Sequence, residues 1–477
     1  MGHGATWTRA ARCTARTGCP GCPGGGTRLP VGPLERPAPD TGTMTPPRVP
    51  TVLLEVPDFD LGLRGKLERA DKAGPGARLA FCSIIYGLSV VDEVVDTPLG
   101  SAANGYPDVF AVPDEATRVS LPWRQGTEAV IADTVHADGS PVLESPRTLL
   151  RHLLAEFDPL GLQPRFGFEY EVYVTQAPNG PQPGAPLDRT ISGYSLSRLA
   201  EAEPVIEEFL ARTEGIGTHV EMVHSEIGPG FFEFALAPAD PLTAADRAAR
   251  SRQCFREVCA AQGLRATFMA KLYGAQSGSG GHVHQSLWQD TRNVFSDGAG
   301  QLSEPGQAYV AGLLATMSDF SALFNPFVNS YKRLDPALFV AARATWGHAT
   351  RNAACRVILD GAAPSARVEH RRPGADASPY LVAAGMLAGG LYGLRGGAHL
   401  VAPLGPGDDL ALAGAELPAD LRTAVGLLEG STVARDLLGP EFVACYGATR
   451  RGELAAFDRW WQSSVTEWEL ARYPDNL

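Results

Sequence analysis

The chain has 477 residues, of which 44% are hydrophobic and 20% are charged, and its formal net charge is −12. This length is enough for two domains with a sizeable buried core, and the acidic balance argues against non-specific binding to nucleic acid or to an anionic membrane. No apolar run reaches the roughly 18 residues that a membrane-spanning helix needs. The eight cysteines show no regular framework, which favours reduced thiols in the cytoplasm.

Residues 1–50 are rich in Gly, Pro, Thr and Arg and lack apolar periodicity, so we expect a disordered tail. Cys13, Cys19 and Cys22 have metal-knuckle spacing but no fourth ligand nearby, which favours an unstructured segment. The tail has no continuous apolar core of the kind found in signal peptides. Met44 is an alternative start, in which case the tail is a gene-model artefact.

Residues 51–145 predict a small, mostly β domain. The runs TVLLEV, RLAFCSIIYGLSVVDEVV and TEAVIADTV are rich in β-branched and apolar residues and are separated by Gly, Pro and Asp breaks. The segment DTPLGSAANGYPD, at 96–108, has turn residues throughout and predicts a long loop of a functional or mobile kind.

From residue 146 onward, predicted strands alternate with helices, which indicates an α+β catalytic domain. The first helix lies in SPRTLLRHLLAEFDPLGL, with Ser145 as a candidate N-cap. Further helical patterns cover residues 192–214, 240–263, 305–324, 378–394 and 415–473. Strand patterns cover FGFEYEVYV (166–174), ATFMAKLYG (266–274) and HVHQSLW (282–288).

Two pairs of carboxylates stand out in this second region. Glu169 and Glu171 lie two apart on a predicted strand, so both side chains point to one face. Glu226 and Glu233 bracket IGPGFF, whose glycines and proline predict a turn that lets the two carboxylates converge. Taken alone, each pair is also consistent with a solvent-exposed face or loop.

A glycine-rich turn, GSGG at 278–281, directly precedes His282 and His284. Strand alternation places both imidazoles on one face, where they could bind a divalent metal, and the exposed backbone amides of the turn could bind phosphate. The alternative is a structural turn followed by two partly buried histidines.

Arginines around Glu369 form a further block. Arginine binds phosphate and carboxylate bidentately and stays charged, so this block predicts an anion site, with surface salt bridges as the alternative. Its members are Arg333, Arg351, Arg356, Arg367 and Arg371.

Six motifs in order, over about residues 145–475, resemble the glutamine synthetase family in its class I form. They are FGFEYE, HSEIGPGFFE, ATFMAKLYGAQSGSGGHVHQSL, NPFVNSYKRL, WGHATRNAACR and RVEHRRPGADASPYLVAAGMLAGGLYG. The resemblance implies an α+β fold with a small β-grasp-like N-terminal domain at 51–145 and a large glutamine-synthetase-type catalytic domain at 146–477. It also implies rings of subunits, usually a dodecamer of two hexameric rings.

The resemblance implies ATP as a substrate and two or three Mg²⁺ or Mn²⁺ ions per site. One ion is expected at Glu171, Glu226 and Glu233, and another at Glu169, His282 and Glu369. Contacts to ATP are expected from His284, Ser286, Arg356 and Arg367. Contacts to glutamate are expected from Gly278, Arg333, Arg351 and Arg371. Arg351 and Arg356 would act catalytically by stabilising the transferring phosphoryl group.

Two departures from the family concern the second substrate. IIYGLSV (84–90) lacks the acid that binds ammonium in class I enzymes, and Phe339 stands where a second acid is expected. Both departures resemble γ-glutamylpolyamine and other γ-glutamylamide synthetases. We therefore expect a ligase that joins the γ-carboxylate of glutamate to an organic amine such as a polyamine, ethanolamine or another monoamine, with Phe339 in the amine pocket. The alternatives are an authentic glutamine synthetase that uses ammonium and a non-catalytic assembly protein.

Overall fold

The smaller of two main β-sheets comes from residues 51–135. Its strands pair in the order β2-β1-β6-β4-β3, with β5 added to β6. β1 runs parallel to β6, and the other pairs are antiparallel. The strands are β1 (Thr51–Pro57), β2 (Leu63–Arg69), β3 (Leu79–Cys82), β4 (Asp108–Pro113), β5 (Val119–Ser120) and β6 (Thr127–Val135). The N-terminal region therefore contains the expected sheet.

The predicted run at 78–95 is strand only over β3. Ser83–Tyr86 forms a 3-10 turn, after which the chain folds back so that the Val95 amide donates to the Gly87 carbonyl at 2.7 Å. A Cβ at Gly87 would lie 2.4 Å from the Val95 carbonyl oxygen, so this closure requires glycine. The sequence did not predict β2, because its LRGKLER pattern is charged, as is common for edge strands.

The larger sheet has β7 and β11 at its centre. Its order is β14-β15-β16-β11-β7-β9-β8, with β10 added to β7 and β12 to β11. Its strands are β7 (Gln163–Gln176), β8 (Val220–Ser225), β9 (Phe231–Leu236), β10 (Leu264–Thr267), β11 (Gly281–Gln289), β12 (Arg292–Asn293), β14 (Trp346–His348), β15 (Cys355–Ile358) and β16 (Arg367–His370). A separate short pair joins β13 (Arg343–Ala344) to β17 (Ala415–Glu416).

The predicted strand at 266–274 ends early, at Thr267. Beyond it, the Ala270 carbonyl accepts from the Ser279 amide at 2.8 Å, and the Lys271 amide donates to Asn329 Oδ1 at 2.9 Å. These partners take the backbone groups that a strand ladder would need, so the chain leaves the sheet here.

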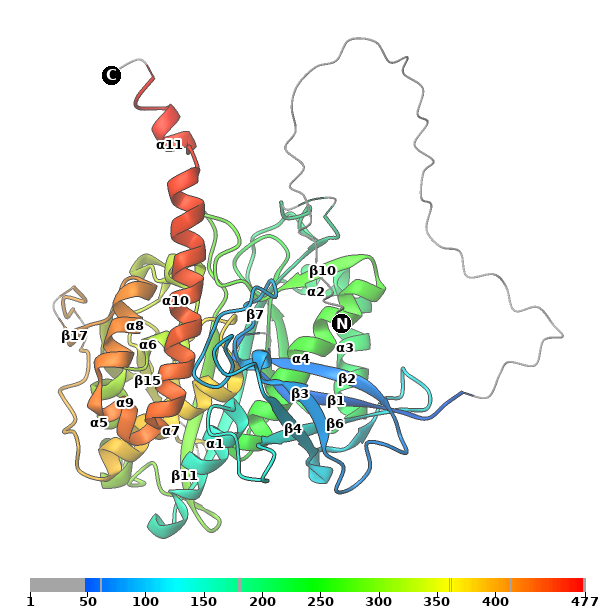
Figure 1. Ribbon diagram of the computed structural model, residues 1–477. Helices are drawn as coiled ribbons and strands as arrows, with labels where there is room; N and C mark the ends of the chain where they lie inside the picture. Colours follow the sequence, from blue (N-terminus) through cyan, green and yellow to red (C-terminus); the bar gives the residue numbers. More distant parts are fainter. Residues whose placement is uncertain are drawn as a thin grey trace, which may run out of the picture. The chain divides into compact units, whose positions relative to one another are not determined.

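The helices are α1 (Pro146–Ala155), α2 (Leu196–Glu201), α3 (Glu203–Gly215), α4 (Pro241–Ala261), α5 (Glu304–Thr316), α6 (Ser321–Phe324), α7 (Pro379–Leu394), α8 (Leu421–Gly430), α9 (Thr432–Leu438), α10 (Pro440–Ser463) and α11 (Glu467–Leu470) (Figure 1). Ser145 occupies the N-cap of α1, although its hydroxyl makes no capping bond. The predicted helix 192–214 divides into α2 and α3, with Pro204 in the first turn of α3. The predictions 305–324 and 415–473 likewise divide into shorter helices.

Helices pack against the aromatic face of the larger sheet. The Tyr170 ring of β7 contacts Phe234 of β9, and the guanidinium of Arg252 from α4 lies 5.4 Å from the Tyr170 ring centre. From α5, the hydroxyl of Tyr309 donates to Gln285 of β11 at 2.9 Å. The opposite face of β7 and β11 is thereby left to line a cavity, which is described below.

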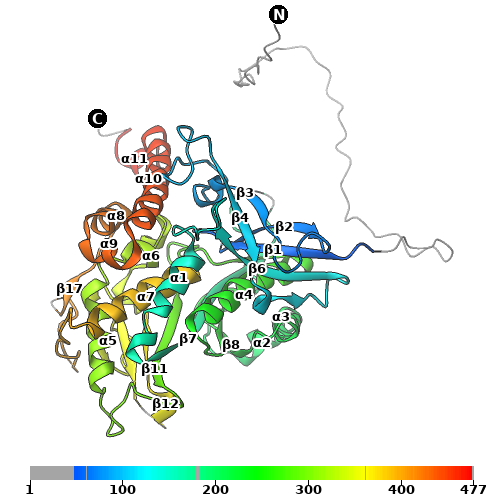
Figure 2. The same cartoon turned by 60° about the horizontal axis from the view of Figure 1, so that its bottom comes forward.

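The computed structural model describes residues 48–60, 62–178, 180, 182–359, 361, 363–405, 407–411 and 413–474. The described residues from Val49 onward form one compact unit, and the loop after β3 approaches α10 (Figure 2). Residues 1–47 of the expected tail, which include Cys13, Cys19 and Cys22, lie outside the described residues. The expected domain boundary at 145 stays a prediction. None of the helices in the described ranges is both long and apolar enough to cross a membrane.

Candidate active site

The floor of the candidate site is the exposed face of β7 and β11. These antiparallel strands pair His282 with Glu169 and Ser286 with Arg165, so their alternate side chains line a cavity of about 910 Å³. Glu169 accepts from His284 at 3.1 Å, and its other oxygen lies 3.3 Å from His282 Nδ1. Strand alternation therefore brings the predicted E-x-E and H-x-H motifs to one place.

The turn between β8 and β9 contributes further carboxylates. The Glu226 amide donates to the Phe231 carbonyl at 2.8 Å and closes the turn. Gly230 has φ +64°, and a Cβ there would lie 2.4 Å from the Val174 carbonyl oxygen, so only glycine fits. His224 then bonds to Glu233 at 2.8 Å and lies 3.6 Å from Glu226. The predicted convergence of Glu226 and Glu233 is present, with His224 between them.

These carboxylates lie close to one another and to imidazoles, and these neighbours change their pKa values. Although burial acts in the opposite sense, the hydrogen bonds from His282 and His284 hold the pKa of Glu169 well below its usual range. Burial raises the pKa of Glu233, and the charges of Glu169 and Glu171 add to this effect. A site that gathers carboxylates in this way favours a bound cation, because a cation offsets their mutual repulsion.

Three overlapping groups of side chains have ligand atoms within 4.8 Å of one another. They are Glu169 with Glu233 and His282, Glu169 with His284 and Glu369, and His224 with Glu226 and Glu233. Each group holds two carboxylates and one imidazole, and carboxylate oxygens are the ligands that suit Mg²⁺ and Mn²⁺. The residues present therefore fit divalent ions of this kind.

Arginines surround the other side of Glu369. Its two oxygens accept from Arg356 at 3.0 Å and from Arg371, while Arg333 lies 3.2 Å from His282 Nε2. Despite burial, Arg371 lowers the pKa of Glu369. The Nε–H groups of Arg333, Arg356 and Arg371 are buried without a hydrogen-bond partner. Unsatisfied buried donors of this kind are costly, so the arrangement suits an anion that would accept from them.

The glycine-rich turn lies against these arginines. A Cβ at Gly278 would lie 2.6 Å from both the Ala270 carbonyl oxygen and Arg333 Cγ. At Gly280 a Cβ would lie 2.5 Å from His282 Nε2. Neither position therefore has room for a side chain, and Gly278 lines the cavity.

The next three amides of the turn already have partners, since those of Ser279, Gly280 and Gly281 donate to the Ala270 carbonyl, to Glu171 and to the Pro373 carbonyl. The prediction that the exposed amides of this turn could bind phosphate is therefore wrong for these three residues.

One end of the cavity carries an aromatic platform. The guanidinium of Arg165 lies 4.2 Å from the Trp288 ring centre, and the indole N–H of Trp288 donates to Ser286 at 2.9 Å. Nearby, Arg367 Nε donates to His284 Nδ1 at 3.2 Å. The stacked ring and cation, together with these polar groups, form a surface on which a planar heterocycle can bind.

The cavity also has apolar lining residues. They include Tyr194, Ile227, Leu338 and Phe339. The Tyr194 ring lies 4.6 Å from the His224 ring and so reaches the carboxylate cluster. Arg351 and Gly278 also line the cavity.

The structure thus brings all the site residues predicted from the sequence to one cavity. Glu171 is held differently from the other acids, because its carboxylate accepts from the Gly280 amide at 2.5 Å and it is absent from the three ligand groups among described residues. The sequence analysis missed His224 and Tyr194. His224 carried a usable signal, since it alternates with Glu226 in HSE, whereas Tyr194 carried none.

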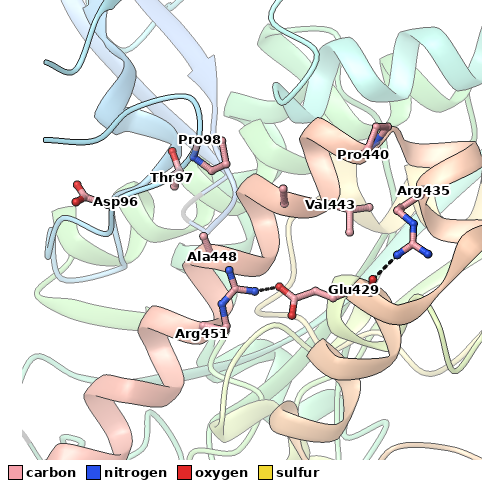
Figure 3. Close-up of a pocket in the computed structure, with 10 residues that line it drawn as sticks. Asp96, Thr97, Pro98, Glu429, Arg435, Pro440, Val443, Ala448 and Arg451 are labelled. Atoms are coloured by element: carbon pink, nitrogen blue, oxygen red, sulfur yellow. Dashed lines mark hydrogen bonds and ion pairs between the residues drawn. The ribbon is translucent and has the colours of Figure 1, made fainter. Parts of the chain in front are cut away.

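A second cavity of about 500 Å³ lies between loop 96–98 and helices α8 to α10 (Figure 3). Glu429 there accepts from Arg435 through its backbone carbonyl and pairs with Arg451 through its carboxylate. None of the site residues predicted from the sequence lines this cavity. The chemistry-bearing residues therefore belong to the first cavity.

Comparison with known proteins agrees with this arrangement. Residues 143–473 match the family model described as glutamine synthetase, catalytic domain. The gamma-glutamylethanolamide synthetase of Streptomyces coelicolor is 34% identical over 89% of this chain and 92% of its own length, and the glutamate–isopropylamine ligase of a Pseudomonas species is 33% identical over 90% and 95%. The ligand-free structure of GmaS superimposes with a TM-score of 0.76 at 30% identity, covering 90% of this chain and 97% of that one. The chain belongs to the glutamine synthetase family.

Proposed function

We propose that the protein is an ATP-dependent ligase that joins the γ-carboxylate of glutamate to an organic amine through γ-glutamyl phosphate. One observation carries the proposal: a cluster of carboxylates and imidazoles and a set of arginines line one cavity, and Phe339 lines the same cavity. The names of the two ligases quoted above, which join glutamate to amines, support the same reaction class.

The carboxylate cluster would hold Mg²⁺ or Mn²⁺, with Glu171, Glu226 and Glu233 for one ion and Glu169, His282 and Glu369 for another. When bound, such ions neutralise the charge of the ATP phosphates and of the transferring phosphoryl group. His224 orients Glu233 and Glu226 through the contacts described above. Such hydrogen-bond partners of metal ligands fix the ligand geometry.

The arginines and the glycine turn would position the two reacting substrates. Arg333, Arg371 and the open backbone at Gly278 hold glutamate, and Arg351 and Arg356 stabilise charge on the phosphoryl oxygens. His284, Ser286 and Arg367 contact ATP, whose base would lie towards Trp288. This order directs the γ-phosphate of ATP to the γ-carboxylate of glutamate, and the carboxylate becomes an activated acyl phosphate that an amine can attack.

Phe339 favours an organic amine over ammonium. A ring at this position offers no negative charge to a small cation, but it provides contact area for carbon. The test is phosphate release by purified protein with ATP, glutamate and Mg²⁺, in the presence of ammonium or of a panel of amines. Higher kcat/KM with ammonium than with any amine would identify a glutamine synthetase instead, and no release with any acceptor would refute catalysis.

We also propose that the protein is a cytoplasmic homo-oligomer, built as a dodecamer of two hexameric rings. The five described cysteines are free, as in a reducing compartment. Apolar side chains at the end of α10, between α10 and α11, and in α11 are 53–72% exposed, and such a group of exposed apolar side chains favours assembly. They are Trp460, Trp461, Val465, Trp468 and Leu470. Light scattering after size exclusion tests the subunit number.

A further inference from the structure

Tyr173 lies on β7 two residues beyond Glu171, on the strand face that also carries Glu169. Its side chain is fully buried, and it is not one of the residues that line the cavity. Its hydroxyl donates to the Ser277 carbonyl at 2.8 Å, and both Ser277 and Gly278 do line the cavity. A buried side chain outside the cavity is thus bonded directly to the turn that would hold glutamate.

The Tyr173 ring is held in place by its neighbours. It stacks on Phe231 of β9 with the ring centres 4.1 Å apart, and the Tyr273 ring meets it edge-on at 5.4 Å. A Cβ at Gly228 would lie 3.0 Å from the Tyr173 hydroxyl oxygen, so the turn between β8 and β9 packs closely on the hydroxyl as well. The hydroxyl therefore has little room to move away from Ser277.

β7 holds the glycine-rich turn at two points. Glu171 accepts from the Gly280 amide, and Tyr173 donates to the Ser277 carbonyl. Among the described residues, the Tyr173 hydroxyl is the one group that is hydrogen-bonded to the backbone of Ser277 or Gly278. The orientation of the peptide unit between these two residues therefore depends on this hydroxyl.

The same bond sets the direction of the Gly278 amide. The Ser277 carbonyl and the Gly278 N–H belong to one planar trans peptide unit, in which they point in opposite directions. Because the carbonyl points to Tyr173, the N–H points away from it. The three amides that follow in the turn are already bonded, whereas no described residue accepts from the Gly278 amide. It is therefore the donor of this turn that a carboxylate of the substrate can use.

We propose that Tyr173 is a positioning residue for glutamate, because its hydroxyl orients the Ser277–Gly278 peptide so that the Gly278 amide donates to a carboxylate of the bound substrate. The proposal rests on the proposed ligase function and deepens it, since it assigns part of the glutamate affinity to a side chain that does not touch the substrate. The Tyr173 ring alone packs on Phe231. Removing only the hydroxyl should therefore leave the turn between β8 and β9, and its carboxylates, in place.

Tyr173→Phe removes the hydroxyl and keeps the ring. We expect KM for glutamate, and Kd for glutamate by titration calorimetry with Mg²⁺ present, to rise about threefold to tenfold, as is usual when one hydrogen bond is lost. The kcat and the KM values for ATP and for the amine should stay within about twofold. Tyr446→Phe is the matched control, because the buried Tyr446 hydroxyl donates to the Ala322 carbonyl at 2.7 Å, outside the cavity. Both variants should lower the midpoint of urea unfolding to a similar extent, but only Tyr173→Phe should weaken glutamate binding.

The route through the Gly278 amide has its own test. In a double variant, adding Tyr173→Phe to Gly278→Ala should weaken glutamate binding no further than Gly278→Ala alone, whereas additive losses would refute this route. Unchanged KM and Kd for glutamate in Tyr173→Phe would overturn the proposal and leave the ligase function standing. An equal rise in KM for ATP would show a general loosening of the site and would overturn it as well. If the native protein releases no phosphate with any amine, the ligase function fails, and the Kd for glutamate still decides the role of Tyr173.

Discussion

Arg198 should control both the stability of the chain and the metal affinity of the site, although it coordinates nothing itself. It lies in α2 with its side chain 2% exposed and pairs at 3.0 Å with Asp188, whose side chain is 1% exposed. It also donates to the carbonyls of Glu226 and Gly228 at 2.6 Å each, and to that of Phe231 at 3.1 Å. One guanidinium therefore fixes the whole turn that presents Glu226.

The burial of this ion pair sets the expected losses of stability and of metal affinity. Arg198→Met leaves the Asp188 charge unpaired and removes one hydrogen bond from each of three turn carbonyls, which should lower the free energy of unfolding by about 3–5 kcal/mol. A loosened turn should weaken Mn²⁺ binding about 10-fold to 100-fold, as is usual when a partner of the ligand shell is lost. Urea unfolding measures the first effect and titration calorimetry with Mn²⁺ the second.

A double variant separates these two effects. Adding Asp188→Asn to Arg198→Met removes the uncompensated charge, so part of the lost stability should return, whereas Mn²⁺ affinity should stay low because the turn still lacks its donor. Arg69→Met is the control, since Arg69 is 61% exposed and its ion pair should contribute at most about 1 kcal/mol. The role of Arg198 is refuted if Arg198→Met binds Mn²⁺ with unchanged affinity. The charge argument is refuted if the double variant loses as much free energy of unfolding as the two single variants together.

Three further results are expected. Mn²⁺ at 100 times its Kd should stabilise the native protein by about 2.7 kcal/mol, which is seen as a rise in Tm. Glu233→Gln should reduce this rise, and an unchanged rise would exclude Glu233 as a ligand. Gly278→Ala should raise KM for glutamate at least tenfold because its Cβ has no room, whereas Gly274→Ala, with nothing within 4 Å, should not. Burial raises the pKa of Asp58 from 3.8 to about 6, so the folded state binds its proton more tightly than the unfolded state. The stability that this carboxyl costs therefore grows as pH rises from about 4 to 6 and is complete above pH 6. Relative to the native protein, Asp58→Asn should therefore gain about 2.5 kcal/mol between pH 4 and pH 8 in urea unfolding, with Asp71→Asn as control, and a pH-independent difference would contradict the shift.

Local periodicity explains why so much of the site could be predicted from the sequence. A strand has a side-chain period of two, so FGFEYEVYV and HVHQSLW each specify which side chains share a face, and the register His282 to Glu169 only had to bring those faces together. The positions that required long-range contacts could not be found in this way. The fold-back of residues 87–95 depends on a hydrogen bond across the loop, and Tyr194 reaches the site because of a left-handed backbone fixed by Ser225.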